Sequence, residues 1–193
     1  MSQREKILAA VKANQPSLVP LPDVSAPRNF QGDLCEKFKN IAITIGSRVL
    51  EVRDFDEIKE QIRSLFPTLG RTVSSYAELS DVAQIGLDDV DPHSLRDVDL
   101  AILKAEFGVA ENGSMWLPET NMMQRALPFI TQHLALVLNK AAIVSTMHEA
   151  YLHEQSSNPG FGAFIAGPSK TADIEQSLVL GAHGPRSMTV FLL

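Results

Sequence analysis

The sequence predicts an α/β fold: a mostly parallel sheet with flanking helices, preceded by an N-terminal helix and a proline-rich arm. Two observations lead to this fold class. Short apolar segments of strand length alternate with helical patterns of about 10–16 residues, which is the arrangement of β-α-β units. The 193 residues are also 45% hydrophobic and 21% charged, a composition typical of a globular domain with a sizeable core.

Residues 1–31 are predicted to form a segment separate from a single α/β domain at residues 32–193. Ser2 and Glu5 have the spacing of a capping box, and apolar residues follow at intervals of three and four, so Ser2–Ala13 is predicted to be a short amphipathic helix. Four prolines exclude a helix from Asn14–Phe30 and favour an extended arm. This arm is either a flexible tether or a strap lying on the domain or on a partner.

The first half of the domain is predicted to contain two helices and two strands, with capping or turn residues at the helix ends. In chain order these are a helix at Asp33–Ile45 that Gly46 ends, a strand at Arg48–Val52, a helix from Asp54 to Phe66 that Pro67 ends, and a strand at Arg71–Ser74. The next segment, Tyr76–Ser94, is polar, and its periodicity is too weak to predict a helix or a strand.

The second half is predicted to be richer in strands, because its apolar runs are short and bounded by turn residues. We expect strands at Leu100–Leu103, Ser114–Leu117, His133–Leu138, Gly162–Ala166 and Thr189–Leu193, a helical turn at Asn121–Phe129 and a helix at Lys140–Gln155.

Charge and cysteine content exclude several classes of function. The formal net charge is −6, which argues against nucleic acid or an anionic membrane as a partner. One cysteine, Cys35, is insufficient for an intrachain disulfide, a cysteine-based zinc site or an iron–sulfur cluster held by this chain alone. No targeting or membrane-spanning segment is recognisable, so we expect a cytoplasmic protein.

Common metal and nucleotide motifs are incomplete in this sequence. His148 and His153 are five residues apart, whereas a zinc-binding HExxH helix needs a spacing of four. Gly160-Phe161-Gly162 lacks the third glycine of a dinucleotide-binding turn. Gly162 and Gly167 have the separation of the two glycines in a phosphate-binding P-loop, but Pro168-Ser169 stand between Gly167 and Lys170-Thr171. We therefore expect neither a metal site nor a bound cofactor.

A candidate anion-binding corner follows the predicted strand Gly162–Ala166. Gly167, Ser169, Lys170 and Thr171 could offer free backbone N–H groups, two hydroxyls and an ammonium, and we expect them at the carboxyl end of a parallel strand. The alternative is an ordinary helix start, in which Ser169 or Thr171 is the N-cap. In both readings the segment continues through Asp173 and Glu175, which are candidate ligand-binding residues or first-turn carboxylates.

Two further turns carry candidate catalytic residues. The turn at Leu180–Arg186 holds His183, which could act as a general acid or base. The turn at Gly108–Ser114 holds Glu111, which could be a base, a nucleophile or a hydrogen-bond acceptor, with Asn112 and Gly113 beside it as ligand-binding residues. Asn112-Gly113 is also an ordinary hairpin turn.

These three loops resemble a known family. The segments Gly167–Glu175 and Leu180–Pro185 resemble the C-terminal signature of the lactate-utilisation protein C family, which has the LUD domain. The segment Gly108–Ser114 is similar to the family's Ala-Glu-Thr-Gly turn, with Asn112 in place of the threonine. Lys170 stands where family members commonly have arginine, which keeps the charge and loses the planar fork of a guanidinium.

The resemblance implies a fold, a pathway and partners. The fold would be like that of the ribose-5-phosphate isomerase, glucosamine-6-phosphate deaminase and CoA-transferase superfamily. The chain would be a subunit or accessory protein in the oxidation of L-lactate to pyruvate, with partner proteins that carry the iron–sulfur clusters.

A weaker similarity joins Ala110–Gly113 to the Ser-Glu-Asn-Gly motif of some CoA-transferases, whose glutamate attacks the thioester. The alternative is therefore a small-molecule enzyme or ligand-binding protein acting through Glu111 and residues 167–175.

Overall fold

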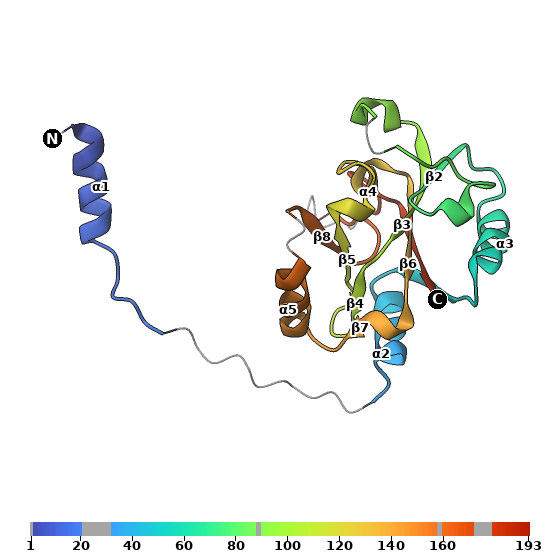
Figure 1. Ribbon diagram of the computed structural model, residues 1–193, viewed down its shortest axis with the longest axis horizontal. Helices are drawn as coiled ribbons and strands as arrows, with labels where there is room; N and C mark the ends of the chain where they lie inside the picture. Colours follow the sequence, from blue (N-terminus) through green and yellow to red (C-terminus); the bar gives the residue numbers. More distant parts are fainter. Residues whose placement is uncertain (1, 21–31, 88–89, 158–159, 172–178) are drawn as a thin grey trace.

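The computed structural model describes residues 2–20, 32–87, 90–157, 160–171 and 179–193 (Figure 1). Helix α1, Gln3–Ala13, has the predicted capping box: the Ser2 hydroxyl accepts from the Glu5 N–H, and the Glu5 carboxylate accepts from the Ser2 N–H. No residue of α1 is buried. The choice between a tether and a strap depends on residues 21–31, which lie outside the described residues.

The centre of the domain is a five-stranded sheet in which every neighbouring pair of strands is parallel, so the predicted fold class is confirmed. The strand order is β1-β9-β6-β3-β2. The strands are β1 Ser47–Glu51, β2 Arg71–Ser74, β3 Val98–Lys104, β6 His133–Leu138 and β9 Ser187–Leu192.

Helices cover both faces of this sheet, and an aspartate caps each of the two long ones. Asp33 accepts from two N–H groups at the start of α2, Leu34–Thr44. Asp54 accepts from the Glu57 N–H at the start of α3, Phe55–Leu65. The two helices lie on opposite faces, because their buried side chains belong to different core clusters.

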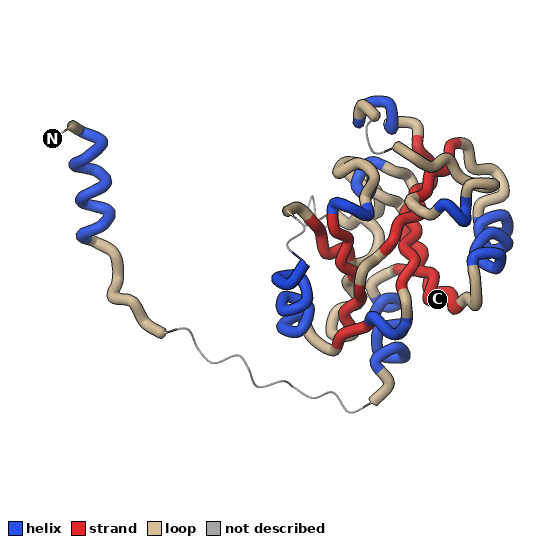
Figure 2. Tube along the Cα trace, viewed as in Figure 1, coloured by secondary structure: helices blue, strands red, loops and turns tan. Residues whose placement is uncertain are grey.

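A second, four-stranded sheet lies on the same side as α2, in the order β7-β4-β5-β8 (Figure 2). Its strands are β4 Phe107–Val109, β5 Met115–Pro118, β7 Ile143–Val144 and β8 Gly162–Ile165, and β5 runs antiparallel to both β4 and β8. Met115 and Leu117 pack toward the main sheet, whereas Phe107 and Trp116 pack with Ala150 of α5, Met147–Ser157. The domain is therefore layered as α3, main sheet, second sheet with α2, and α5.

Two predictions in the second half are wrong in part. Lys140–Gln155 is not one helix: it contains a 3-10 turn at Lys140–Ala142, then β7, and α5 begins only at Met147. Ile143 and Val144 pair in parallel with β4, and this tertiary pairing outweighs their helical spacing. The predicted turn at 121–129 splits into a 3-10 turn at Glu119–Asn121 and helix α4, Leu127–Ile130. Across the described residues, no helix has the length and apolarity needed to span a bilayer.

Candidate functional site

A cavity of about 260 Å³ brings together four of the predicted site residues: Gly167, Ser169, Lys170 and His183. Together with Gly184 and Pro185 they form the wall of the cavity that consists of loops. The apolar wall comes from elsewhere in the chain and consists of Pro128, Phe129, Leu134 and Ile165.

The cavity loops are held together by backbone hydrogen bonds. The Ser169 N–H donates to the Pro185 carbonyl at 2.9 Å, and the Gly181 N–H donates to the Ser169 carbonyl at 3.0 Å. Further out, the Thr171 N–H donates to the Val179 carbonyl at 3.1 Å, and the Val179 N–H donates to the Thr171 hydroxyl at 3.0 Å. The predicted free N–H groups of Ser169 and Thr171 are therefore engaged within the loops, which corrects the sequence-based expectation.

Two glycines allow close packing around the cavity, one against the end of α2 and one between the two loops. Gly167 has φ +75°, and a Cβ there would lie 2.7 Å from the carbonyl oxygen of Ile45. A Cβ on Gly184 would lie 3.0 Å from the Cβ of Ser169. Larger residues at either position would displace one loop wall of the cavity.

The cavity lies at the amino end of the main sheet, because Leu134 is the second residue of β6. The expectation that the Gly167 loop follows a strand of the parallel sheet is wrong: β8 is an edge strand of the second sheet and pairs antiparallel with β5. The apolar alternation of a single strand gives no information about the direction of its neighbour, so sequence reasoning had no signal for this difference.

The lining of the cavity is electropositive. Among the described residues that line it none is acidic, and Lys170 and His183 are the basic ones. The Lys170 ammonium donates to the Pro168 carbonyl in a long contact of 3.4 Å. A small anion would therefore meet a cation, the Ser169 hydroxyl and an imidazole. Thr171 is not among the lining residues, and the predicted Asp173 and Glu175 fall outside the described residues.

The Glu111 turn lies apart from this cavity and joins β4 to β5 as a hairpin, which is the alternative that Asn112-Gly113 offered. The Glu111 carboxylate accepts a hydrogen bond of 2.8 Å from the Met147 N–H, at the start of α5. The Asn112 side-chain oxygen accepts from the Ser114 N–H and hydroxyl, and Gly113 has φ +70° with Ala42 of α2 beside it. None of the three predicted residues, Glu111, Asn112 and Gly113, lines the cavity.

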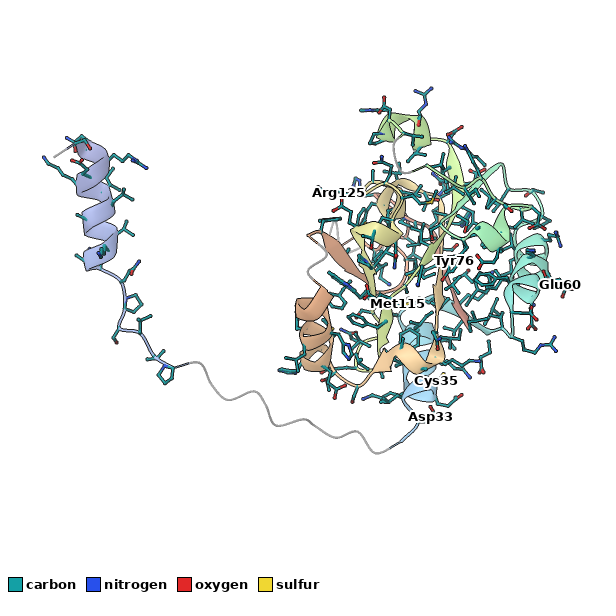
Figure 3. The ribbon with its side chains drawn as sticks, viewed as in Figure 1. Asp33, Cys35, Glu60, Tyr76, Met115 and Arg125 are labelled. Carbon is teal, nitrogen blue, oxygen red and sulfur yellow. The ribbon has the colours of Figure 1, made fainter. Side chains whose placement is uncertain are left out.

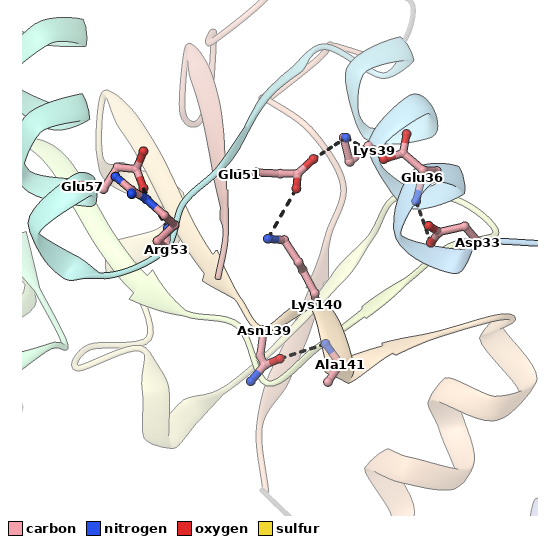
Figure 4. Close-up of polar contacts among 9 residues, drawn as sticks. All are labelled: Asp33, Glu36, Lys39, Glu51, Arg53, Glu57, Asn139, Lys140 and Ala141. Carbon is pink, nitrogen blue, oxygen red and sulfur yellow. Dashed lines mark hydrogen bonds and ion pairs between the residues drawn. The ribbon is translucent and has the colours of Figure 1, made fainter.

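The carboxyl end of β1 carries a network of ion pairs. The Glu51 carboxylate pairs with Lys39 of α2 and with Lys140, and Lys39 also pairs with Glu36 (Figure 4). Hydrogen bonding to Lys39 lowers the pKa of Glu51, and the two carboxylates raise the pKa of Lys39. These charges satisfy one another and connect α2, β1 and the segment after β6.

Cys35 and Tyr76 are not activated groups. Figure 3 places Cys35 beside Asp33 at the start of α2, where partial burial and the Asp33 carboxylate raise the pKa of the thiol. Burial raises the pKa of Tyr76 to about 12, and its ring packs 4.9 Å from that of Phe55. A raised pKa keeps the thiol and the phenol protonated and weakly nucleophilic.

Comparisons with known proteins agree with this picture of the domain. The model of the LUD domain family matches residues 92–193, which include the Glu111 turn and both cavity loops. The lactate utilization protein C of Geobacillus thermodenitrificans is 33% identical over 109 residues, and that of Geobacillus sp. strain WCH70 is 34% identical over 101 residues. These matches cover 53% and 49% of the chain, but only 45% and 42% of the two relatives.

A solved structure shows the same fold. The crystal structure of a DUF162 family protein from Deinococcus radiodurans superposes with a TM-score of 0.62 at 16% sequence identity. The superposition covers 82% of this chain and 95% of that chain. At this identity the likeness establishes the architecture alone.

Proposed function

The chain belongs to the LUD domain family, and from that premise we propose that it acts in lactate utilisation, as a subunit or accessory protein of a system that oxidises L-lactate to pyruvate. The observation that carries the proposal is the 33–34% identity to proteins named lactate utilization protein C. That similarity covers about half of this chain and less than half of those relatives, so the proposal concerns the pathway and the role of this domain.

The proposed role is binding or assembly beside partners that carry iron–sulfur clusters. Such clusters need several cysteine ligands, usually four, and this sequence has one cysteine. Electron transfer would therefore take place in other polypeptides. The exposed Ile7, Leu8 and Val11 of α1 offer one surface for contacting them.

The cavity between the Gly167 and His183 loops is the proposed ligand site. Its volume suits a small organic acid, and Lys170 with the Ser169 hydroxyl supplies donors for a carboxylate. We propose that His183, which lines the same cavity, contacts the remainder of the ligand and moves a proton. Asp173 and Glu175 remain proposed members of the same loop.

The alternative is a small-molecule enzyme with Glu111 as nucleophile or base. It has less support, because the Glu111 carboxylate is hydrogen-bonded to the start of α5 and does not line the cavity that Lys170 and His183 share. An enzyme that used His183 without Glu111 would agree better with this geometry.

The test is reconstitution of lactate oxidation with co-expressed neighbouring gene products, measured as lactate-dependent reduction of an electron acceptor. Lys170→Gln should lower the rate, whereas Arg96→Gln, a matched loss of charge at an exposed position outside the cavity, should not. Glu111→Gln should keep the rate. If the protein copurifies with no partner and its omission leaves lactate oxidation unchanged, the proposed function is wrong.

A further inference from the structure

A second and larger cavity, of about 440 Å³, lies at the same end of the main sheet as the first. One wall is the end of α3 with the segment that follows it, residues 65–69, and the other is formed by the amino ends of β1, β6 and β9. Neither the Glu111 turn nor the loops of the first cavity line it.

Four polar side chains on three neighbouring strands line this cavity: Arg48, His133, Ser187 and Thr189. His133 is paired in register with Ser187, and Arg48 with Thr189. Side chains at paired positions project from the same face of a sheet, and Ser187 and Thr189 are two residues apart on one strand. All four therefore lie on the α3 face, which is the face of Phe191.

The His133 ring is fixed from two sides. Its Nδ1 lies 2.7 Å from the Ser187 hydroxyl oxygen, and its ring centroid lies 5.3 Å from that of Phe66. When the hydroxyl donates to Nδ1, the neutral ring carries its proton on Nε2. Burial lowers the pKa of His133, which favours this neutral form. Nε2 is then the ring donor left for a ligand.

The charges around the cavity favour an anion. Among the described residues, no Asp or Glu lines the cavity and Arg48 forms no ion pair. Asp99 is the carboxylate that acts electrostatically on His133, and its Oδ2 already accepts the Gly70 N–H at 2.7 Å. The Arg48 guanidinium is planar and suits two oxygens of one oxyanion.

We propose that this cavity is a second ligand site, in which Arg48 and His133 bind the oxyanion, phosphate or carboxylate, of a small molecule. Ser187 orients the imidazole, and Thr189, which is 1% exposed, offers a hydroxyl at the cavity floor. The site is separate from the first cavity, because Leu134, the neighbour of His133, faces the opposite side of the sheet and lines that cavity. The inference does not depend on the proposed function.

The experiment is titration of the full chain with inorganic phosphate and, separately, with acetate, followed by amide chemical shifts in ¹H–¹⁵N NMR spectra. We expect saturable shifts at Thr68 and Ser187. Arg48→Gln should weaken binding about tenfold or more, the usual effect of losing a charge-assisted hydrogen bond. His133→Asn keeps a polar atom near Ser187 but removes Nε2, and should also weaken binding. The two titrations distinguish a phosphate site from a carboxylate site.

Lys170→Gln is the matched control, because it removes a cation from the first cavity only. It should leave the shifts at Thr68 and Ser187 unchanged, and the unfolding temperature of each variant checks that the fold persists. The proposal is overturned if neither anion gives saturable shifts, if Arg48→Gln binds as tightly as the native chain, or if the shifts are confined to Ser169 and Gly184. Shifts confined to Ser169 and Gly184 would place the anion in the first cavity and leave the proposed role in lactate utilisation standing, so the two proposals fail separately.

Discussion

Replacement of Glu111 should cost stability and leave activity intact. The first N–H groups of a helix have no partner within the helix, and the Glu111 carboxylate accepts one of them, from Met147, at 2.8 Å. A negative charge at a helix start contributes about 0.3–1 kcal/mol, and the hydrogen bond about 1 kcal/mol. Both are lost in Glu111→Ala, so we expect a decrease of about 1–2 kcal/mol in the free energy of unfolding, whereas Glu111→Gln keeps an acceptor oxygen and should lose about half of that.

Thermal unfolding followed by circular dichroism measures this effect. For a chain of this length, 1 kcal/mol corresponds to a shift of roughly 2–4 °C in Tm, so Glu111→Ala should unfold roughly 2–8 °C lower. The lactate oxidation rate of both variants should remain native at temperatures well below Tm. If Glu111→Gln abolishes the rate while Tm is unchanged, the carboxylate acts in chemistry and the capping argument is refuted.

Three further predictions concern the core and pH. In Gly162→Ala the new Cβ would clash with the Trp116 ring, so we expect a decrease of about 1–3 kcal/mol in the free energy of unfolding, measured by urea unfolding. Phe38 is fully buried between α2 and β4, and Phe38→Ala should lose about 3–5 kcal/mol in the same assay; a loss below about 1 kcal/mol would contradict its placement. Burial lowers the pKa of His133 below 6.5, so the unfolded chain binds its proton more readily, and this contribution to stability is present above about pH 6.5 and lost as pH falls. His133→Gln should flatten the pH dependence of Tm below about pH 6.5; an unchanged profile would show that His133 is not its source.

Local signals made much of the fold predictable. Asp33 and Asp54 were recognisable as helix caps because a cap depends on residues two or three positions away, and the structure has both. The buried strand at His133–Leu138 was recognisable because its apolar run is continuous, as expected for a central parallel strand.

Features that depend on distant pairing were not predictable. Strand β4 has three residues with a glycine in the middle, and that glycine is explained by Leu138, because a Cβ on Gly108 would lie 2.7 Å from its Cδ2. Strand β7 has two residues and exists through pairing with β4. No local pattern encodes either contact, so the sequence could not separate β7 from the helix that follows it.

The candidate site was partly predictable for the same reason. Gly167, Ser169, Lys170 and His183 came from loop composition and family resemblance, and the structure brings them to one cavity. Glu111 came from the same reasoning, but the hairpin directs its carboxylate to Met147, 36 residues later in the chain. Arg48 gave no sequence signal, because a single arginine in a strand pattern becomes notable only when the register places it beside Thr189 and near His133.

The starts of β6 and β9 contribute residues to both cavities, and this affects how substitutions in either cavity are interpreted. Leu134 lines the first cavity, and His133, its neighbour in β6, lines the second. Likewise Pro185 lines the first cavity, and Ser187, the first residue of β9, lines the second. Between them, the Arg186 N–H donates to the Gln132 carbonyl at 2.8 Å, which joins the two chain segments. A substitution that shifts this junction would change both cavities together. Arg48→Gln and Lys170→Gln each remove a cation from one cavity only. If each variant weakens only the anion-induced shifts of its own cavity, the cation binds the anion. If either variant changes the shifts of both cavities, the junction is displaced.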